Sequence, residues 1–205
     1  MTEKEKMLAG KIYDPSDKEL EQLRITAHRL SKDFNSTYED ELEKRGEIMK
    51  KLVPEMGKGT CLIGPVMFDY GVFTKFGENC FANFNFTVLD CCPVEIGSDV
   101  FFGPNCTIAT PVHPLLADER KFRFKEDGTP YDLEYAKPIK IGNGCWLASN
   151  VTVCGGVTIG ENCVIGAGSV VTRDIPAGVF AAGNPCRVIR KITEADSIYL
   201  KKDLF

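Results

Sequence analysis

The sequence predicts a mainly β protein, a left-handed parallel β-helix of hexapeptide repeats with a small N-terminal helical cap and a long inserted loop. Three observations support this fold class. Aliphatic residues recur every six positions in the second half of the chain, the first 58 residues show helical spacing instead, and residues 114–138 interrupt the repeat. A fixed short period is typical of solenoid proteins.

The N-terminal segment differs from the rest of the chain in its periodicity. From Asp17 to Leu30, apolar residues are spaced as on one face of a helix. A second helix is expected after Thr37, with Asp40 completing its capping box, and it should end near Leu52. Because a solenoid needs a polar lid on its open end, we expect residues 1–58 to form a helical cap.

The repeat itself is most regular from Ile139 onward. The third position of each six-residue unit is aliphatic in every case: Ile141, Leu147, Val153, Ile159, Ile165 and Val171. An upstream run has the same period at Ile96, Phe102 and Ile108. Alternation around a polar residue predicts a short strand, and Gly, Asn or Asp predicts the turn after it. Three such units close a triangular coil, so residues 59–191 should stack as a β-helix, followed by a tail at 192–205.

Residues 114–138 form a long, charged break in this pattern. The segment from Leu115 to Tyr135 is rich in Asp, Glu, Lys and Arg. Long loops in compact domains are commonly functional, although a merely tolerated insertion is the alternative.

Composition excludes several classes of function. The chain has 205 residues, a net charge of −4 and a pI near 5.4, so it has no basic surplus for nucleic acid. No apolar run reaches the roughly 18 residues of a membrane-spanning helix. No secretory signal opens the sequence, which predicts a cytoplasmic protein. The nine cysteines lack zinc-finger spacing, and most are expected to be small, unpaired core residues.

Two features of the residues point to chemistry. His113 is the only histidine of the repeat region and stands where the long loop begins, so it is a candidate general base. Between Thr172 and Lys191, four cations (Arg173, Arg187, Arg190 and Lys191) accompany a single anion, Asp174. This basic stripe favours a polyanionic ligand, and a solvated positive face is the alternative.

The chain resembles the maltose and galactoside O-acetyltransferases among the hexapeptide-repeat acyltransferases. The resemblance covers nearly the whole sequence and rests on five segments. Four of the matching places are the opening Met7–Tyr13, the Phe81–Asp90 block, the His113-Pro114 step and the stretch from Pro138 to Trp146, and a fifth is Ala182–Arg190. The resemblance implies a homotrimer with active sites between subunits, acetyl-CoA as co-substrate, a small sugar as acceptor and no required metal.

The resemblance also implies roles for individual residues. His113 would deprotonate a sugar hydroxyl that attacks the thioester directly. The acceptor would be bound by Asn83, Asp90, Asp69, Tyr70 and an acid from the cap, either Asp17 or, alternatively, Asp14. Acetyl-CoA would be bound by Ser149, Ala167, Thr172, Arg173, Arg187 and Arg190.

Two departures and two alternatives accompany this resemblance. The family's two adjacent acids are replaced here by Asp90-Cys91, and Thr110-Pro111-Val112 precedes His113 in place of the commoner threonine-rich approach. His113 also shows no obvious carboxylate partner, so a backbone carbonyl is expected to orient it. Acetylation of a non-sugar acceptor such as serine and a non-catalytic β-helix scaffold are the competing functions. A zinc lyase is excluded because it needs three histidine ligands and the repeat region has one.

Overall fold

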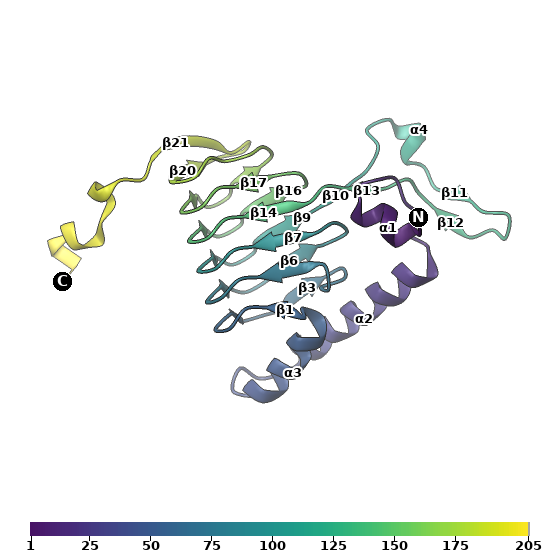
Figure 1. Cartoon of the computed structure of the whole chain (residues 1–205), viewed down its shortest axis with the longest axis horizontal. Coiled ribbons are helices and arrows are strands. Elements are labelled where there is room, and N and C mark those ends of the chain that lie inside the picture. Colours follow the sequence, from purple (N-terminus) through teal and green to yellow (C-terminus); the bar gives the residue numbers. More distant parts are fainter. Residues whose placement is uncertain (205) are drawn as a thin grey trace.

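The chain folds into a stack of coils with helices along one side and at one end, and this confirms the predicted β-helix (Figure 1). The computed structural model describes residues 1–204. Three helices come first, α1 (Glu3–Leu8), α2 (Lys18–Asn35) and α3 (Leu42–Leu52). Within the described residues, no helix is both long and apolar enough to cross a membrane.

Three sheets form the sides of the stack, and the chain visits them in turn. Sheet 1 contains β1 (Glu55–Met56), β4 (Thr74–Phe76), β7 (Val94–Ile96), β14 (Ile139–Ile141) and β17 (Thr158–Ile159). Sheet 2 contains β2 (Cys61–Leu62), β5 (Phe81–Ala82), β8 (Phe101–Phe102), β15 (Trp146–Leu147), β18 (Val164–Ile165), β20 (Val179–Ala182) and the antiparallel β21 (Arg187–Lys191). Sheet 3 contains β3 (Val66–Phe68), β6 (Phe86–Leu89), β9 (Thr107–Ala109), β16 (Thr152–Cys154) and β19 (Val170–Val171).

The repeat positions do what the sequence pattern predicts. The aliphatic third positions from Ile141 to Val171 are buried in one continuous core. At the corner between sheets 1 and 2, one residue per coil has a positive φ: Gly59, Asn79, Asp99, Gly144, Asn162 and Gly178. Glycine and asparagine tolerate this left-handed conformation best, which explains the turn residues of the repeat.

The core cysteines are structural, as expected. Cys80, Cys106, Cys145 and Cys163 are buried, and all nine cysteines are free. The Cys145 thiol donates to the Gly160 carbonyl at 3.1 Å, and burial raises the pKa of Cys145 to about 11. A thiol in that state is a small core residue and not a nucleophile.

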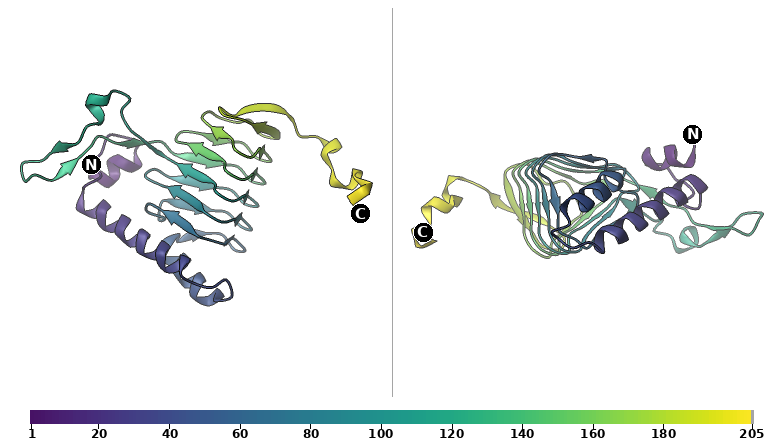
Figure 2. Two further views of the ribbon diagram at one scale, coloured as in Figure 1. Left: turned by 180° about the vertical axis from the view of Figure 1, so that it is seen from behind. Right: turned by 90° about the horizontal axis from the view of Figure 1, so that it is seen from below.

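The N-terminal cap packs in two places. Phe34, Met49 and Leu52 join the solenoid core, and α3 lies across the end of the prism (Figure 2). Met7 and Leu20 instead form a second cluster. The expected capping box at Asp40 is wrong, because α3 begins at Leu42 and its N-cap makes no side-chain hydrogen bond. Helix α1, which the sequence analysis did not predict, has a capping box between Thr2 and Glu5.

The inserted loop lies between β9 and β14 and has structure of its own. It contains β10 (Pro111–Val112), α4 (Ala117–Arg120), β11 (Arg123–Phe124), β12 (Pro130–Tyr131) and β13 (Tyr135–Ala136). We call residues 111–136 the insertion. Its β11–β12 hairpin extends beyond the stack on the side of the N-terminus, whereas the tail with η1 (Glu194–Asp196), η2 (Ile198–Leu200) and η3 (Lys202–Leu204) extends on the opposite side (Figure 1).

The outer faces of sheets 1 and 2 differ in character. In sheet 1, Glu55, Lys75, Glu95 and Lys140 stand in register, and ion pairs join Lys75 to Glu55 at 2.7 Å and Lys140 to Glu95 at 2.9 Å. In sheet 2 the register brings together Phe81, Phe101, Trp146 and Val164. Phe101 and Trp146 are 49% and 52% exposed. We call these four residues the aromatic stripe.

Close stacking of the coils generates a stability prediction at Gly142. A Cβ added there would lie 2.6 Å from the backbone nitrogen of Glu161 in the next coil. We therefore expect Gly142→Ala to lower the free energy of unfolding by about 1–3 kcal/mol, the usual cost of overpacking. Gly46→Ala is the matched control, because a Cβ at Gly46 in α3 meets nothing within 4 Å.

The control should stabilise the protein by about 0.5–1 kcal/mol, since alanine is the better helix former. Thermal and denaturant unfolding of both variants measures the two effects. If Gly142→Ala and the parent protein have the same free energy of unfolding, the two coils can move apart at this corner without loss of stability.

Candidate active site

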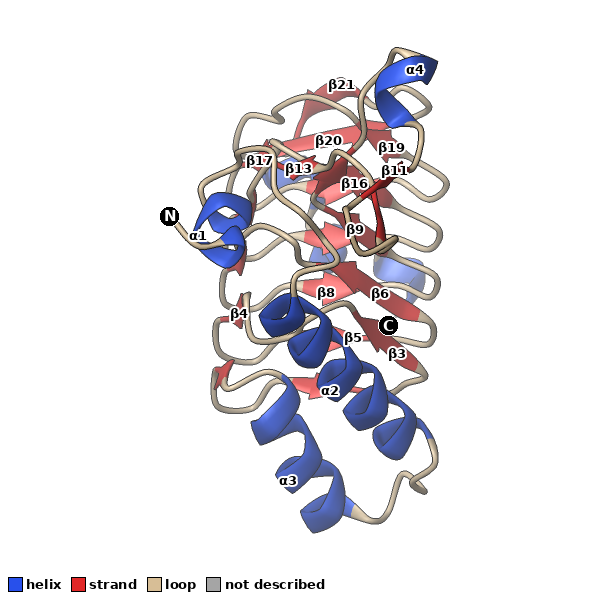
Figure 3. Cartoon of the chain, turned by 90° about the vertical axis from the view of Figure 1, so that its right-hand side faces the viewer, coloured by secondary structure: helices blue, strands red, loops and turns tan. Residues whose placement is uncertain are grey.

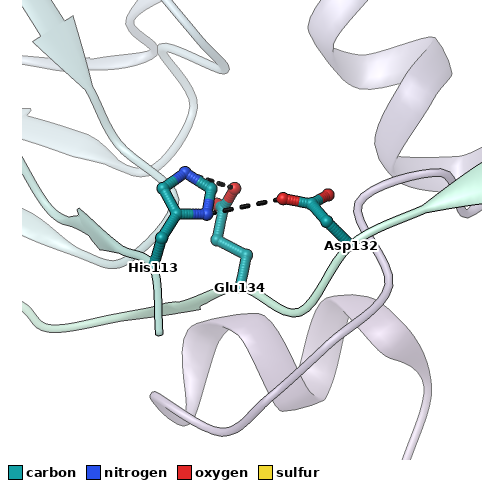
Figure 4. Close-up of side chains that lie close together, drawn as sticks. All are labelled: His113, Asp132 and Glu134. Carbon is teal, nitrogen blue, oxygen red and sulfur yellow. Dashed lines mark ion pairs between the residues drawn. The ribbon is translucent and has the colours of Figure 1, made fainter. Parts of the chain in front are cut away.

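Strand pairing places His113 opposite two acids of the insertion. β10 and β13 are antiparallel, with Pro111 opposite Ala136 and Val112 opposite Tyr135. Continuing this register by one residue brings His113 to Glu134. Asp132 is two residues from Glu134, and alternate residues of an extended chain point to the same side. The three side chains meet at the base of the insertion (Figure 4).

The two carboxylates flank both nitrogens of the imidazole. Nδ1 of His113 lies 3.4 Å from Oδ2 of Asp132, and Nε2 lies 3.7 Å from Oε2 of Glu134. The expectation that a backbone carbonyl alone would orient His113 is therefore wrong. The sequence signal that identifies these partners is the alternation of Asp132 and Glu134 with apolar residues just before β13. Their donor atoms and those of His113 lie within 4.8 Å of one another, close enough to share a cation.

A cavity of about 340 Å³ adjoins this cluster, and we call it the insertion pocket. It lies between the N-terminal segment, α2, the turns after β3 and β6, and the insertion (Figure 3 shows α1 and α2 beside the stack). Its walls combine aromatic, polar and charged side chains from these parts: Tyr13, Pro15, Ser16, Arg24, Asp69, Tyr70, Cys91, Phe122, Pro130, Tyr131, Asp132 and Glu134.

Asp69 and Tyr70, predicted from the resemblance, both line this pocket. Burial raises the pKa of Asp69, and the Cys91 thiol, which donates to Oδ2 at 3.6 Å, opposes that rise. Nε2 of His28 lies 3.8 Å from the other carboxylate oxygen. Cys91 thus lies in the wall of the insertion pocket, at the position where the resemblance implies a second acidic residue.

Asp90 does not line the pocket, which corrects its predicted role. Its side chain is fully buried. Its two carboxylate oxygens accept hydrogen bonds from the backbone nitrogens of Tyr70, Gly71 and Phe73 and from the Thr74 hydroxyl, at 2.9–3.3 Å. Asp90 therefore builds the turn that carries Asp69 and Tyr70, because a buried carboxylate must satisfy its acceptors within the protein.

The acids of the cap, Asp17 and Asp14, are also engaged elsewhere within the chain. Asp17 is the N-cap of α2 and accepts from the backbone of Glu19 at 3.0 Å. Asp14 forms an ion pair with Lys125 of the insertion at 2.5 Å. Neither lines the insertion pocket, and its acidic walls come from Asp69, Asp132 and Glu134. Asp17 therefore does not reach the insertion pocket of its own chain.

Three other predicted residues lie at a different corner of the prism. Asn83, Ser149 and Ala167 follow β5, β15 and β18, at the corner between sheets 2 and 3. His113 and Asp69 belong to the corner between sheets 3 and 1. A single chain therefore does not bring Asn83 together with His113.

The predicted cationic residues are spread over two elements. Thr172 and Arg173 follow β19 and are exposed at the same corner as His113. Arg187 and Arg190 are exposed on β21. The Arg190 guanidinium donates to both carboxylate oxygens of Asp196 at 2.6 and 2.7 Å, so the tail neutralises part of the basic stripe. Sequence reasoning did not anticipate this pair, nor the pocket residues Tyr13 and Arg24.

Comparison with known families agrees with this architecture. The maltose acetyltransferase hexapeptide capping motif matches residues 6–57. The bacterial transferase hexapeptide, with six repeats, matches residues 138–173. The hexapeptide repeat of succinyl-transferase matches residues 93–113.

Individual relatives extend the match to nearly the full length. The galactoside O-acetyltransferase of Escherichia coli (strain K12) is 41% identical over 199 residues, covering 97% of this chain and 94% of the relative. The crystal structure of a maltose O-acetyltransferase from Clostridium difficile 630 is 46% identical with a TM-score of 0.87, covering 95% of this chain and 99% of that one. A galactoside acetyltransferase in complex with coenzyme A is 39% identical, also with a TM-score of 0.87, covering 96% and 94% of the two chains. The chain therefore belongs to the maltose and galactoside O-acetyltransferase family of hexapeptide-repeat proteins.

Proposed function

We propose that the protein transfers the acetyl group of acetyl-CoA to a hydroxyl group of a small sugar. The observation that carries this proposal is the placement of His113 between Asp132 and Glu134 beside the insertion pocket. The pocket combines carboxylates, an arginine and tyrosines, a set of groups that suits an acceptor with several hydroxyls. The relatives named for galactoside and maltose acetylation support the same substrate class.

His113 acts as the general base in the proposed reaction. Asp132, near Nδ1, favours the tautomer that carries its proton there and leaves Nε2 to accept one. Nε2 takes the proton of the sugar hydroxyl while its oxygen attacks the thioester carbonyl carbon. The tetrahedral intermediate then collapses, the carbon–sulfur bond breaks, and the coenzyme A sulfur takes the proton from the imidazolium. No step requires a metal ion.

The carboxylates stabilise the charge that develops on the ring. As the proton arrives, His113 becomes an imidazolium, and two nearby negative charges favour that form in the transition state. In the proposed complex the backbone N–H near Ser149 binds the thioester oxygen. Ala167, Thr172 and Arg173 contact the pantetheine and phosphates, with Arg187 and Arg190 toward the nucleotide end.

The separation of the two corners favours a site made from two chains. In a closed ring of three copies, each copy presents one corner to a neighbour and another corner to the other neighbour. The Asn83–Ser149–Ala167 corner of one copy would then face the His113 corner of the next. The exposed aromatic stripe of sheet 2 borders the Asn83 corner and is the apolar surface we assign to this trimer contact.

The first prediction tests the base. His113→Ala should lower kcat by about 10²–10⁴-fold, the usual contribution of general-base catalysis, with little change in acetyl-CoA affinity. In the parent protein kcat/KM should fall toward acid pH, because protonation of the ring removes the base. Thiol release from acetyl-CoA with a panel of sugars measures both quantities. A chelator should leave the kcat of the parent protein unchanged. A folded His113→Ala variant whose kcat is close to that of the parent protein would refute the mechanism.

The second prediction concerns the coenzyme. Arg187→Ala should raise the KM for acetyl-CoA and leave the saturated rate nearly unchanged, because it removes binding energy that ground state and transition state share. Isothermal titration with coenzyme A provides the independent measurement. A loss confined to kcat would place Arg187 at the reacting atoms instead.

The third prediction tests the assembly. Trp146→Glu puts a charge into the aromatic stripe and should dissociate the trimer into chains of 22.7 kDa in sedimentation equilibrium, with loss of activity. Thr158→Glu is the matched control, since it adds the same charge to the outer face of sheet 1 beside Lys140 and should stay trimeric. An active Trp146→Glu monomer would contradict the two-chain site.

A further inference from the structure

The N-terminal segment is attached to the insertion through one residue, Tyr13. Its backbone N–H donates to the Glu134 carbonyl at 3.1 Å, in an antiparallel bridge. Its hydroxyl donates to Oε1 of the same glutamate. Tyr13 is 2% exposed, and burial raises the pKa of its hydroxyl above the usual value, so the group remains a proton donor. Backbone and side chain together fix Glu134 from the side away from His113.

The same carboxylate faces the catalytic imidazole with its other oxygen. Oε2 of Glu134 lies 3.7 Å from Nε2 of His113, beyond hydrogen-bonding distance but close enough for a strong charge interaction. A glutamate side chain has three rotatable bonds, so a carboxylate without a partner at Oε1 could move the last few tenths of an ångström. It would then form a hydrogen-bonded ion pair with the protonated ring and occupy the nitrogen that must receive the substrate proton.

We propose that Tyr13 is a positioning residue that holds the Glu134 carboxylate short of Nε2 of His113, so that this nitrogen stays free to act as the base. The inference rests on the proposed function of His113. It adds a role for the N-terminal cap, because the hydroxyl that sets the imidazole's environment comes from a segment outside the β-helix.

Other charged groups around the ring do not supply this restraint. Asp132 approaches Nδ1 and not Nε2. Arg24 and Asp69 line the pocket from α2 and from the turn after β3. The Cys91 side chain, from the turn after β6, lies against those of Tyr13 and Glu134 and therefore belongs to the same group of contacts. Lys125 holds the insertion hairpin to Asp14 and Ser16, one to three residues beyond Tyr13, and so keeps this N-terminal segment in place.

The test follows the protonation of His113 directly by NMR of histidine labelled with ¹³C at Cε1. The chain has two histidines, and His113→Ala identifies which signal belongs to His113. In Tyr13→Phe the freed carboxylate should close on the ring and favour the imidazolium, so the midpoint of the titration should rise by about one pH unit. Glu134→Gln should lower the midpoint. When Tyr13→Phe is added to Glu134→Gln, the midpoint of the His113 titration should stay where Glu134→Gln alone puts it.

Kinetics supply the second readout. At pH values below both measured midpoints, kcat/KM of Tyr13→Phe should be about tenfold below the parent, since one pH unit is a factor of ten in the neutral base, and it should recover at high pH. Tyr38→Phe removes a hydroxyl from a tyrosine that is 78% exposed between α2 and α3, and it should leave both profiles unchanged.

Three outcomes overturn the inference without touching the proposed function. One is an unshifted His113 titration in folded Tyr13→Phe. Another is the same rise in the Glu134→Gln background, which would mean that the hydroxyl acts by another route. The third is a midpoint of the His113 titration in Glu134→Gln that equals the midpoint in the parent protein. That result would overturn the inference even if Tyr13→Phe does not fold. Failure of the proposed function itself would appear separately, as an active His113→Ala variant.

Discussion

Close, in-register stacking of the coils sets where every other part of this protein can lie. Each strand donates and accepts its backbone hydrogen bonds along the stack, so any bulk at a corner separates two coils and weakens both ladders. At Gly103, for example, an added Cβ would lie 2.7 Å from the Ser149 backbone nitrogen. This constraint aligns turns from distant parts of the sequence in columns. Residues for binding can therefore be placed at one corner of successive coils without any special local structure.

The candidate active site lies where the chain leaves the repeat. The insertion departs after β9 and returns as β13, and its antiparallel pairing with β10 is what brings two carboxylates to His113. The N-terminal segment then closes over the return strand through Tyr13 and through the pairing of Asp14 with Lys125. The rigid stack thus supplies a fixed edge, and two segments outside the repeat build a pocket against it.

Burial divides the acids of this region into two groups with different tasks. Asp90 is fully enclosed and satisfies its oxygens with four donors of one turn, so its contribution is the shape of the pocket wall. Asp132 and Glu134 keep side-chain exposures of 21% and 13% and face an imidazole, so their charge acts on the ring in the proposed reaction. The same residue type therefore shapes the site in one place and stabilises charge in another, according to its access to solvent and to partners.

The β-helix, its turn residues, the buried cysteines, the helical cap and the position of His113 at the start of the insertion could all be predicted from the residues alone. These properties are local, because a strand of alternating residues followed by a turn with positive φ is decided within six residues. The residues alone did not predict the partners of His113, the burial of Asp90, the capping role of Asp17, the pair between Arg190 and Asp196 or the corner at which Asn83 lies. Each of these depends on which segments meet across the insertion, the cap and the tail, and only tertiary packing decides such contacts between residues far apart in the chain.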